Sequence, residues 1–504
     1  MGVPALVMLA LGLWGLDRGG MWRDEAVTFQ VAGRTVPQIW RLLHSVDAVH
    51  GLYYLLMYAV LAVHPDEVVL RLPSVCAAAV TAGLVAALGA RLLRPRAGLW
   101  AGLLYAGSPM AGHYAQEGRS YALVAAGATG ATLLFVRAVG RGGRAWWAYG
   151  ALLGLTCWLH EFAVLLLLAH AVSLALGRAG ARVWRGWGCA AAAVGVSLAP
   201  LALVSRSQSA QVAWLRPPTV ETAQGLLRMF LGPTDGVYWA CLGLAAVGLL
   251  GVVGRRGEVT CAGVCLPLAV VPPVALMLVS QFSPLYVDRY VLYALSGAPV
   301  LVAAGAEKVA GLLGRLRPAA PAGVRFLVGS PFLALAGVFA LVLSFFHQLP
   351  LMDTDRDPAR RPDDLAAVSR VAARELRPGD PVLFLPAYTR NVALTYPGAF
   401  RGVRDIGLAE GAAGSGTLYG REVDASVLGR RLAGLDRVWV VADRDVLAGR
   451  WVVQSPVTRA ALALLDTEFA PVRESVQDEV AVRLYVRWSG VSPGPLPGPS
   501  PARW

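Results

Sequence analysis

Long apolar runs recur along the first 350 of the 504 residues, and they constrain the fold of this chain more than any other feature. A helix needs about 17–25 mostly apolar residues to cross a bilayer, and several runs reach that length. Apolar residues make up 56% of the chain, and Asp, Glu, Lys and Arg only 15%. An ordinary soluble protein carries about 25% charged residues. The composition therefore excludes a disordered chain, a coiled coil and an ordinary cytosolic enzyme.

We predict a mainly α membrane protein with about 11 transmembrane helices. The predicted spans are residues 3–16, 70–93, 97–114, 120–138, 145–159, 162–177, 187–204, 237–254, 259–280, 290–306 and 324–346. With the N-terminus in the cytoplasm, the inside loops contain 15 basic residues and two acids, and the outside segments contain ten basic residues and eleven acids. This is the positive-inside rule, and it fixes the orientation. Of the net charge of +13, +12 belongs to residues 1–352, so the charge does not indicate nucleic-acid binding.

The first outside loop, residues 17–69, contains an apolar stretch at 52–63 that is too short to span. As a helix it measures about 18 Å, whereas the hydrocarbon core is about 30 Å thick. If it crossed the membrane, every later basic loop would move outside. We therefore place 52–63 at the outer surface of the bilayer, and we predict a second interfacial helix at 36–46, whose apolar side chains share one face.

From Asp353 onward the composition becomes that of a soluble domain, with 19 basic and 19 acidic residues up to position 488. Strands and helices alternate there, which predicts a small α/β domain, placed outside the cytoplasm by the eleven spans. We expect helices near 363–378, 389–396, 426–433 and 457–468, and strands at 381–386, 437–443 and 471–487. The domains are then 1–350 for the transmembrane domain and 353–488 for the α/β domain. Residues 407–420 are a Gly-rich loop, and 489–504 are a disordered tail.

Polar side chains gather at the outside ends of the predicted spans, where ionisable groups are costly to desolvate and are functional candidates. Asp24 and Glu25 follow the first span, and a second group occupies the segment AQEGRSY. The candidate site residues are Asp24, Glu25, His50, Gln116, Glu117, Arg119, Tyr121, His160, Glu161, Arg289 and Tyr290. Because all of them lie on one side of the membrane, a shared cleft explains them better than separate structural roles.

Each group also has a structural explanation. Asp24 and Glu25 could be solvated loop acids, and Glu117 and Arg119 could pair at a helix end. Arg289 could extend to lipid headgroups. Histidines at such positions are often structural.

The combination nevertheless suits one chemistry. A carboxylate can act as general base on a hydroxyl, and an arginine can bind a phosphate through two hydrogen bonds. Aromatic side chains can stack on a sugar, and apolar grooves can hold a lipid tail. The residues therefore favour sugar transfer from a lipid phosphate to a hydroxyl acceptor at the outer surface. Phosphate is already a stable leaving group, so no general acid is needed.

Six segments in this order resemble a known family. They are WRDEA, VHGLYYLL, LRLPS, AQEGRSYAL, LHEFAVLLLL and FSPLYVDRYVLY. The chain is similar to the polytopic GT-C glycosyltransferases of the protein O-mannosyltransferase and aminoarabinose-transferase type, which are glycosyltransferase family 39 and its relatives. The resemblance covers about residues 1–350, and a soluble outside domain after the last span also fits it.

The resemblance implies an inverting transfer of mannose or another hexose from a polyprenyl-phosphate donor to a hydroxyl of a protein, lipid or glycan. It implies that Asp24 is the general base and that Glu25 serves acceptor or metal binding. Arg289 would meet the donor phosphate, together with Tyr290 and Arg119. The acceptor or sugar would contact the remaining candidates, which are Gln116, Glu117, Tyr121, His50, His160 and Glu161.

Several matters stay open at this point. No ligand spacing is diagnostic of a metal, so a divalent metal is neither required nor excluded, and no other cofactor is indicated. The alternatives to an enzyme are a polytopic lipid or polysaccharide transporter and a non-enzymatic envelope assembly protein. We place the protein in a plasma membrane, as a bacterial multi-pass protein with its active site outside the cytoplasm and with membrane lipid as a partner.

The orientation gives a direct test. A reporter fused after Arg144 should read cytoplasmic, because this residue lies in a basic loop, and a reporter fused after Asp363 should read external. Paired fusions of alkaline phosphatase and a fluorescent protein would measure both positions. Reporters that read the same side at both positions would contradict the eleven-span topology.

Overall fold

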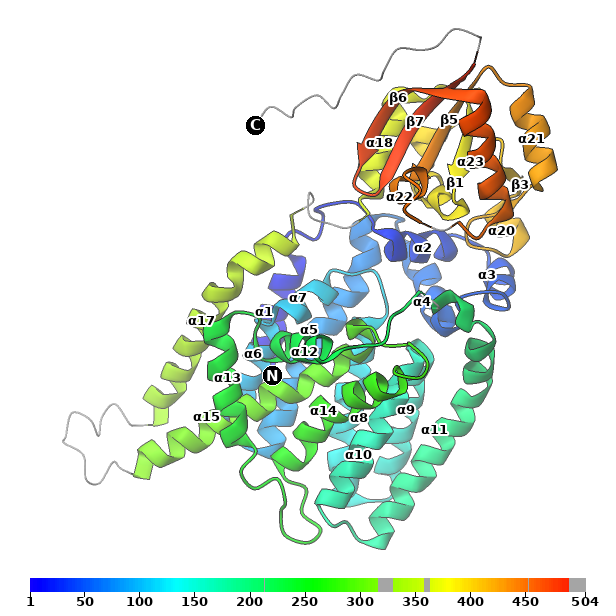
Figure 1. Ribbon diagram of the computed structural model, residues 1–504. Coiled ribbons are helices and arrows are strands. Elements are labelled where there is room, and N and C mark those ends of the chain that lie inside the picture. The colour runs from blue at the N-terminus through cyan, green and yellow to red at the C-terminus, as the bar shows by residue number, and fades with distance from the viewer. Residues whose placement is uncertain (213, 316–329, 358–362, 452, 489–504) are drawn as a thin grey trace. The chain divides into compact units, whose positions relative to one another are not determined.

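The computed structural model describes residues 1–504 except 213, 316–329, 358–362, 452 and 489–504 (Figure 1). Contacts divide the chain into two units. The first, here called the membrane unit, comprises Met1–Asp17, Asp47–Leu56 and Val68–Arg356. The second, here called the sheet unit, comprises Arg18–Val46, Met57–Glu67 and the described part of Asp357–Trp504. The predicted disordered tail and residues 324–329 of the last predicted span lie outside the described residues.

Six helical segments in the described chain are long and apolar enough to cross a membrane. They are α5 (Glu67–Leu92), α8 (Tyr121–Arg141), α11 (Ala181–Ser207), α14 (Cys261–Val279), Asp288–Leu312 within η4 (Asp288–Ser296) and α15 (Gly297–Arg315), and Leu335–Asp355 within α17 (Ser330–Asp355). The other helices are α1 (Gly2–Leu13), η1 (Ala48–His50), α4 (Gly51–Leu61), α6 (Pro95–Ala106), α7 (Pro109–Ala115), α9 (Arg144–Leu159), η2 (Glu161–Val164), α10 (Leu165–Leu176), η3 (Ser209–Val212), α12 (Val220–Leu231) and α13 (Asp235–Gly248).

The mainly α membrane fold predicted from the sequence is confirmed, and each predicted span overlaps a helix. The number of spans stays a prediction, because several of these helices are short. The predicted span 97–114 is two helices, α6 and α7, with a break at Gly107 and Ser108. Pro109 explains the break, since a proline lacks an N–H to continue α6 but suits the first position of a new helix.

Helices of the membrane unit approach closely where small residues meet. At the crossing of α13 and α15, a Cβ on Gly305 would lie 1.8 Å from the Leu244 carbonyl oxygen. No side chain fits there, so the two backbones can touch. In lipid, helix association depends on such packing rather than on the hydrophobic effect.

The C-terminal part of the sheet unit is the predicted α/β domain. Its five strands have the order β2-β1-β5-β7-β6. The central strands β1 (Pro381–Leu385) and β5 (Arg437–Asp443) are parallel and almost wholly buried, as their continuous apolar sequences require. The edge strands are β2 (Arg404–Asp405) and β6 (Phe469–Gln477), and β7 (Val480–Arg487) lies between β5 and β6, antiparallel to both.

Helices cover this sheet. Against β6 and β7 lies α18 (Leu365–Glu375), while α21 (Ala425–Ala433) and α23 (Pro456–Glu468) pack side by side (Figure 1). The shorter elements are η7 (Ala387–Arg390), α19 (Asn391–Thr395), η8 (Pro397–Phe400), β3 (Leu408–Glu410), α20 (Ala412–Ser415), β4 (Arg421–Glu422) and α22 (Arg444–Leu447). The sequence did not predict β2, β3, β4 or α22, because each is only two to four residues long.

Much of the first outside loop groups with this domain. Its residues form α2 (Arg23–Ala32) and α3 (Val36–Leu43). Arg34 donates hydrogen bonds to the carbonyl oxygens of Thr417 (2.9 Å) and Leu418 (3.2 Å), and Arg41 donates to Gly414 (2.9 Å). The Gly-rich segment 407–420 is thus hydrogen-bonded to Arg34 and Arg41 of the N-terminal segment. It contains β3 and α20.

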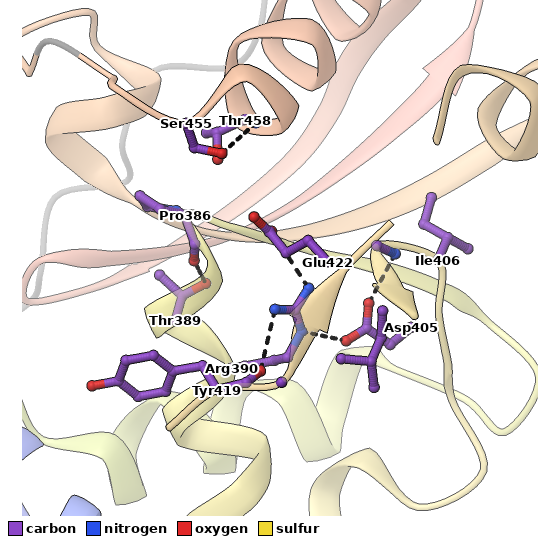
Figure 2. A network of polar contacts seen from close by, with 12 residues as sticks. Pro386, Thr389, Arg390, Asp405, Ile406, Tyr419, Glu422, Ser455 and Thr458 are labelled. Atoms are coloured by element: carbon purple, nitrogen blue, oxygen red, sulfur yellow. Dashed lines mark hydrogen bonds and ion pairs between the residues drawn. The ribbon is translucent and has the colours of Figure 1, made fainter. Parts of the chain in front are cut away.

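A buried arginine organises the sheet unit next to β1. The Arg390 guanidinium pairs with Asp405 at 2.6 Å and with Glu422 at 3.8 Å, and it donates to the Tyr419 carbonyl at 3.4 Å (Figure 2). Only 3% of the Arg390 side chain is exposed. Burial raises the pKa of Glu422, which the Arg390 charge opposes and the Asp405 charge reinforces.

The substitution Asp405→Asn tests this network. Removing the Asp405 charge takes away the closer partner of the buried Arg390 guanidinium and leaves Glu422 at 3.8 Å, which costs up to about 3 kcal/mol. We expect hydrogen exchange of the β1 amides to report a loss of about that size in the free energy of local unfolding. The control is Asp445→Asn in the exposed Asp445–Arg450 pair, where the loss should stay under about 1 kcal/mol. Equal effects of the two substitutions would refute the role given to Arg390.

Candidate functional site

The turn between α7 and α8 carries three of the predicted site residues, Gln116, Glu117 and Arg119, and close packing fixes its course. A Cβ on Gly118 would lie 2.6 Å from Leu70 Cγ, so glycine lets the turn pass against α5. The Ser74 hydroxyl donates to the Arg119 carbonyl oxygen at 3.1 Å. Glu117 and Arg119 are both buried. A short, tightly packed turn therefore holds an acidic and a basic side chain, Glu117 and Arg119, inside the membrane unit.

Gln116 has a structural partner in this turn. Its side-chain amide donates to the carbonyl oxygens of Gly12 (2.9 Å) and Trp14 (2.8 Å) at the end of α1. Arg71 donates to Leu16 and Arg356 to Leu11 and Trp14. Helix ends leave carbonyl groups unsatisfied, and no water reaches them in an apolar surrounding. Gln116 therefore helps to cap α1, and its assignment to acceptor binding stays a prediction.

The contact between Arg119 and His50 determines which nitrogen of the His50 imidazole carries the hydrogen. A guanidinium nitrogen of Arg119 lies 2.8 Å from Nε2 of His50. Arginine can only donate, so Nε2 must be the unprotonated acceptor and Nδ1 carries the hydrogen. Among the described residues, Nδ1 of His50 has no hydrogen-bond partner. His50 therefore offers a neutral N–H donor.

Arg289 lies among aromatic rings. Its Nε donates to the Tyr121 hydroxyl at 3.2 Å, and its guanidinium lies 5.8 Å from the ring centres of both Tyr121 and Tyr290. The neighbouring Asp288 accepts hydrogen bonds from the Arg289 amide (2.8 Å) and from the Tyr114 hydroxyl (3.3 Å). Cation–π contacts and these hydrogen bonds orient the guanidinium at the start of η4.

The ring of His160 lies near His50, which contacts Arg119, and near the two tyrosines that contact Arg289. Its ring centre lies 4.7 Å from that of Tyr290, 5.6 Å from that of Tyr121 and 6.1 Å from that of His50. Burial lowers the pKa of His160 to about 3, and the charges of Arg119 and Arg289 act in the same direction. The imidazole is therefore neutral at physiological pH. Its Nδ1 has no hydrogen-bond partner in the described part of the chain.

A cavity of about 360 Å³ opens beside these residues. Four predicted site residues line it, namely His50, His160, Glu161 and Tyr290. Glu161 accepts a hydrogen bond from the Ser205 hydroxyl at 2.8 Å. Two imidazole rings, a carboxylate and a tyrosine thus meet around a space large enough for one sugar-sized ligand.

The structure brings seven predicted residues together in the membrane unit: His50, Arg119, Tyr121, His160, Glu161, Arg289 and Tyr290. Asp24 and Glu25 belong to the sheet unit, where they occupy the first turn of α2. Carboxylates are favourable there because the N-terminus of a helix carries partial positive charge. Glu25 is fully buried.

Sequence reasoning missed the contribution of α11. Ser205, Arg206 and Gln208, at the end of this helix, also line the cavity. Arg206 was one of the ten basic residues outside, and its position at a span end was the signal that could have included it. Asp47, which accepts a hydrogen bond from Tyr54 at 2.7 Å, also lines the cavity.

Two further features bear on possible ligands. The described residues contain no group of three His, Cys, Asp or Glu side chains arranged to hold a metal ion. A larger cavity of about 720 Å³ between α6, α13, α15 and α17 is lined mostly by apolar side chains. Such a surface suits lipid chains and lacks the charged groups that a sugar phosphate needs.

Comparison with known proteins places this geometry in context. Residues 50–205 match the family described as dolichyl-phosphate-mannose-protein mannosyltransferase. No curated protein matches the chain. The crystal structure of ArnT from Cupriavidus metallidurans in the apo state is similar, with a TM-score of 0.60, 14% identity and coverage of 96% of this chain and 97% of that one.

The same ArnT bound to undecaprenyl phosphate gives a TM-score of 0.58 and 14% identity over 98% of this chain and 99% of that chain. At this level of identity the likeness establishes the fold, over nearly the full length of both proteins. Together with the family match it confirms the resemblance noted in the sequence. The chain has the fold of the GT-C superfamily of polytopic membrane glycosyltransferases.

Proposed function

We propose that this protein is an integral membrane glycosyltransferase that moves a sugar, mannose or another hexose, from a polyprenyl-phosphate donor to a hydroxyl acceptor, with inversion. The reaction takes place on the outer face of the membrane. The observation that carries the proposal is the cavity of the membrane unit lined by His50, His160, Glu161 and Tyr290. Beside it, Arg289 contacts Tyr121 and Tyr290. The GT-C fold supports it, as does the binding of undecaprenyl phosphate by ArnT.

The phosphate contact is assigned to Arg289, with Tyr290 and Arg119 beside it. The Nε of Arg289 donates to the Tyr121 hydroxyl. A planar guanidinium can bind two phosphate oxygens at once. Held between tyrosine rings, it loses little side-chain freedom on binding. A phosphate leaving from the sugar carbon would gain negative charge there, and the arginine would stabilise it.

The sugar contacts are assigned to the cavity wall. Nδ1–H of His50 is a donor for a sugar or acceptor oxygen, and Tyr290 offers an aromatic face next to it. Glu161 is a hydroxyl acceptor on the same wall. Neutral histidines add hydrogen bonds without adding charge, which favours recognition of hydroxyl groups. Glu117, Gln116 and Tyr121 complete the set assigned to the acceptor or sugar.

The chemical step needs one base. The acceptor oxygen forms a bond to the anomeric carbon as the bond from that carbon to the phosphate oxygen breaks, and the electron pair leaves with the phosphate. We assign the proton of the acceptor hydroxyl to the Asp24 carboxylate, as the GT-C pattern implies. Glu25, the adjacent acid, points in another direction on α2 and is assigned to acceptor binding.

The broad test is direct transfer. Purified full-length protein would be incubated with radiolabelled polyprenyl-phosphate mannose and membrane extract, and transfer of label to the extract would be measured. Label transfer supports a glycosyltransferase. If no label is transferred from the mannose donor or from other hexose donors, the transporter or the envelope assembly protein is favoured instead.

The substitution Arg289→Lys tests the phosphate contact. Lysine keeps the charge but cannot form the paired hydrogen bonds of arginine. We expect the donor concentration for half-maximal rate to rise in Arg289→Lys and to rise further in Arg289→Ala.

Arg228→Lys is the matched control, because the Arg228 guanidinium also lies over a tyrosine ring, that of Tyr238, at 4.8 Å, but Arg228 is not one of the residues assigned to the site. Its donor dependence should equal that of the wild type. An unchanged donor dependence in both Arg289 variants would remove Arg289 from the site.

The substitution Asp24→Asn tests the base. Asparagine keeps the size of the side chain but removes its basicity, and loss of a general base costs about 10²–10⁴ in rate. We expect turnover to fall by that factor while expression and donor binding stay near normal. Single-turnover measurements at saturating donor would isolate the chemical step.

Glu25→Gln is the neighbouring control. It should change the dependence on acceptor concentration and affect the chemical step less. If Glu25→Gln abolishes turnover while Asp24→Asn retains it, the two roles are reversed. If both variants retain normal turnover, neither acid is the base, and the assignment of the catalytic loop fails.

A further inference from the structure

The side chain of Asn391 holds α2, the helix that carries Asp24 and Glu25, at two places. Its Nδ2 donates to the Arg23 carbonyl oxygen at 3.3 Å. Its Oδ1 accepts from Gln30 Nε2, which also donates to the Asn391 carbonyl oxygen (3.2 Å) and to the Thr395 hydroxyl (2.7 Å). Only 2% of Asn391 is exposed. All these residues belong to the sheet unit.

The spacing of the two contacts fixes the helix in rotation as well as in position. Arg23 and Gln30 are seven residues apart, so they lie on the same face of α2, within about 20° of each other. Asp24 is turned from that face by about 100° and Glu25 by about 200°. The contacts with Asn391 therefore hold one face of α2 and leave the two acids on its other faces.

A second set of contacts holds the entry to the helix. The Tyr396 hydroxyl accepts from the Met21 amide at 2.9 Å and donates to Glu67 at 2.9 Å. The Arg23 guanidinium pairs with Asp363 at 3.3 Å and lies 5.0 Å from the ring centre of Tyr388. Gly20 passes so close to α18 that a Cβ there would lie 2.6 Å from Ala366 Cβ.

These contacts occupy a particular edge of the sheet. Tyr388 and Asn391 follow the carboxyl end of β1, and Asp443, which accepts a hydrogen bond from the Tyr388 hydroxyl, ends β5. In open sheets with parallel strands, the carboxyl ends form the edge at which ligands bind. Here α2 of the same chain occupies that edge.

We propose that the C-terminal α/β domain is a positioning device for the catalytic acids, and that Asn391 and Tyr396 are its principal positioning residues. The inference rests on the proposed function, because it takes Asp24 as the general base. The domain itself contacts no reacting atom in this scheme. It sets the rotation and position of α2, and a displacement of about 1 Å at a reacting group can cost about 10²-fold in rate.

The test combines hydrogen exchange with kinetics on the full-length protein. In Asn391→Ala, amides of residues 21–32 should exchange faster, while amides of β1 and β5 stay as in the wild type. Turnover should fall about 10- to 100-fold, with the donor concentration for half-maximal rate unchanged. Gln30→Ala, at a partly exposed position, should produce the same pattern more weakly.

Thr389→Val is the matched control. Thr389 is equally buried and lies two residues before Asn391, but its hydroxyl donates to the carbonyl oxygens of Pro386 and Val441 (Figure 2). The substitution Thr389→Val should leave both the amide hydrogen exchange of α2 and the turnover near the wild-type values. The double variant Gln30→Ala/Asn391→Ala should lose no more turnover than Asn391→Ala, because the two side chains form one set of contacts.

The outcomes separate this inference from the proposed function. Unchanged exchange of residues 21–32 in Asn391→Ala overturns the inference, and so does faster exchange with normal turnover. If Asp24→Asn is inactive while Asn391→Ala is fully active, the positioning role fails and the proposed function stands. If Asp24→Asn is fully active, the assignment of the base fails first, and α2 then carries no base to position.

Discussion

An arginine side chain can donate hydrogen bonds but cannot accept them, and the polar chemistry of the membrane unit follows from this constraint. The hydrogen bond from Arg119 makes Nε2 of His50 an acceptor and leaves Nδ1 as a donor. Burial lowers the pKa of His160, and the charges of Arg119 and Arg289 act in the same direction. Both histidines are therefore neutral, and both line the cavity as hydrogen-bonding groups without charge.

Much of the fold could be predicted from the sequence. Apolar runs identify membrane helices because the bilayer sets their length, and the alternation of strands and helices after Asp353 identified the α/β domain. The break between α6 and α7 was missed, since hydropathy averages over a proline that begins a new helix. The helix α2 was missed because RDEAVTFQVA has no apolar stripe, and its partners Asn391 and Tyr396 are more than 360 residues away.

The candidate site, like the fold, could be predicted only in part. Residues near span ends could be recognised because ionisable groups are rare at that depth, and seven of them meet in the membrane unit. The contacts that give each a role could not be predicted, since they join segments far apart in the chain. Gln116 illustrates this: its position in AQEGRSY predicts a site residue, and only the structure shows that its amide also caps α1. Arg206 and Ser205 were not predicted, because only the fold shows that the end of α11 lines the cavity.

The contact between the Met21 amide and the Tyr396 hydroxyl joins residues 375 positions apart. A ribosome that adds about 5–20 residues per second needs roughly 20–75 s to make that length of chain. During this interval the N-terminal acids have already been synthesised, but the residues that hold them do not yet exist. A chain released early, by a premature stop or a cleaved nascent terminus, therefore lacks these contacts even when its membrane helices are complete. The contact at Met21 therefore forms only after residue 396 has been synthesised.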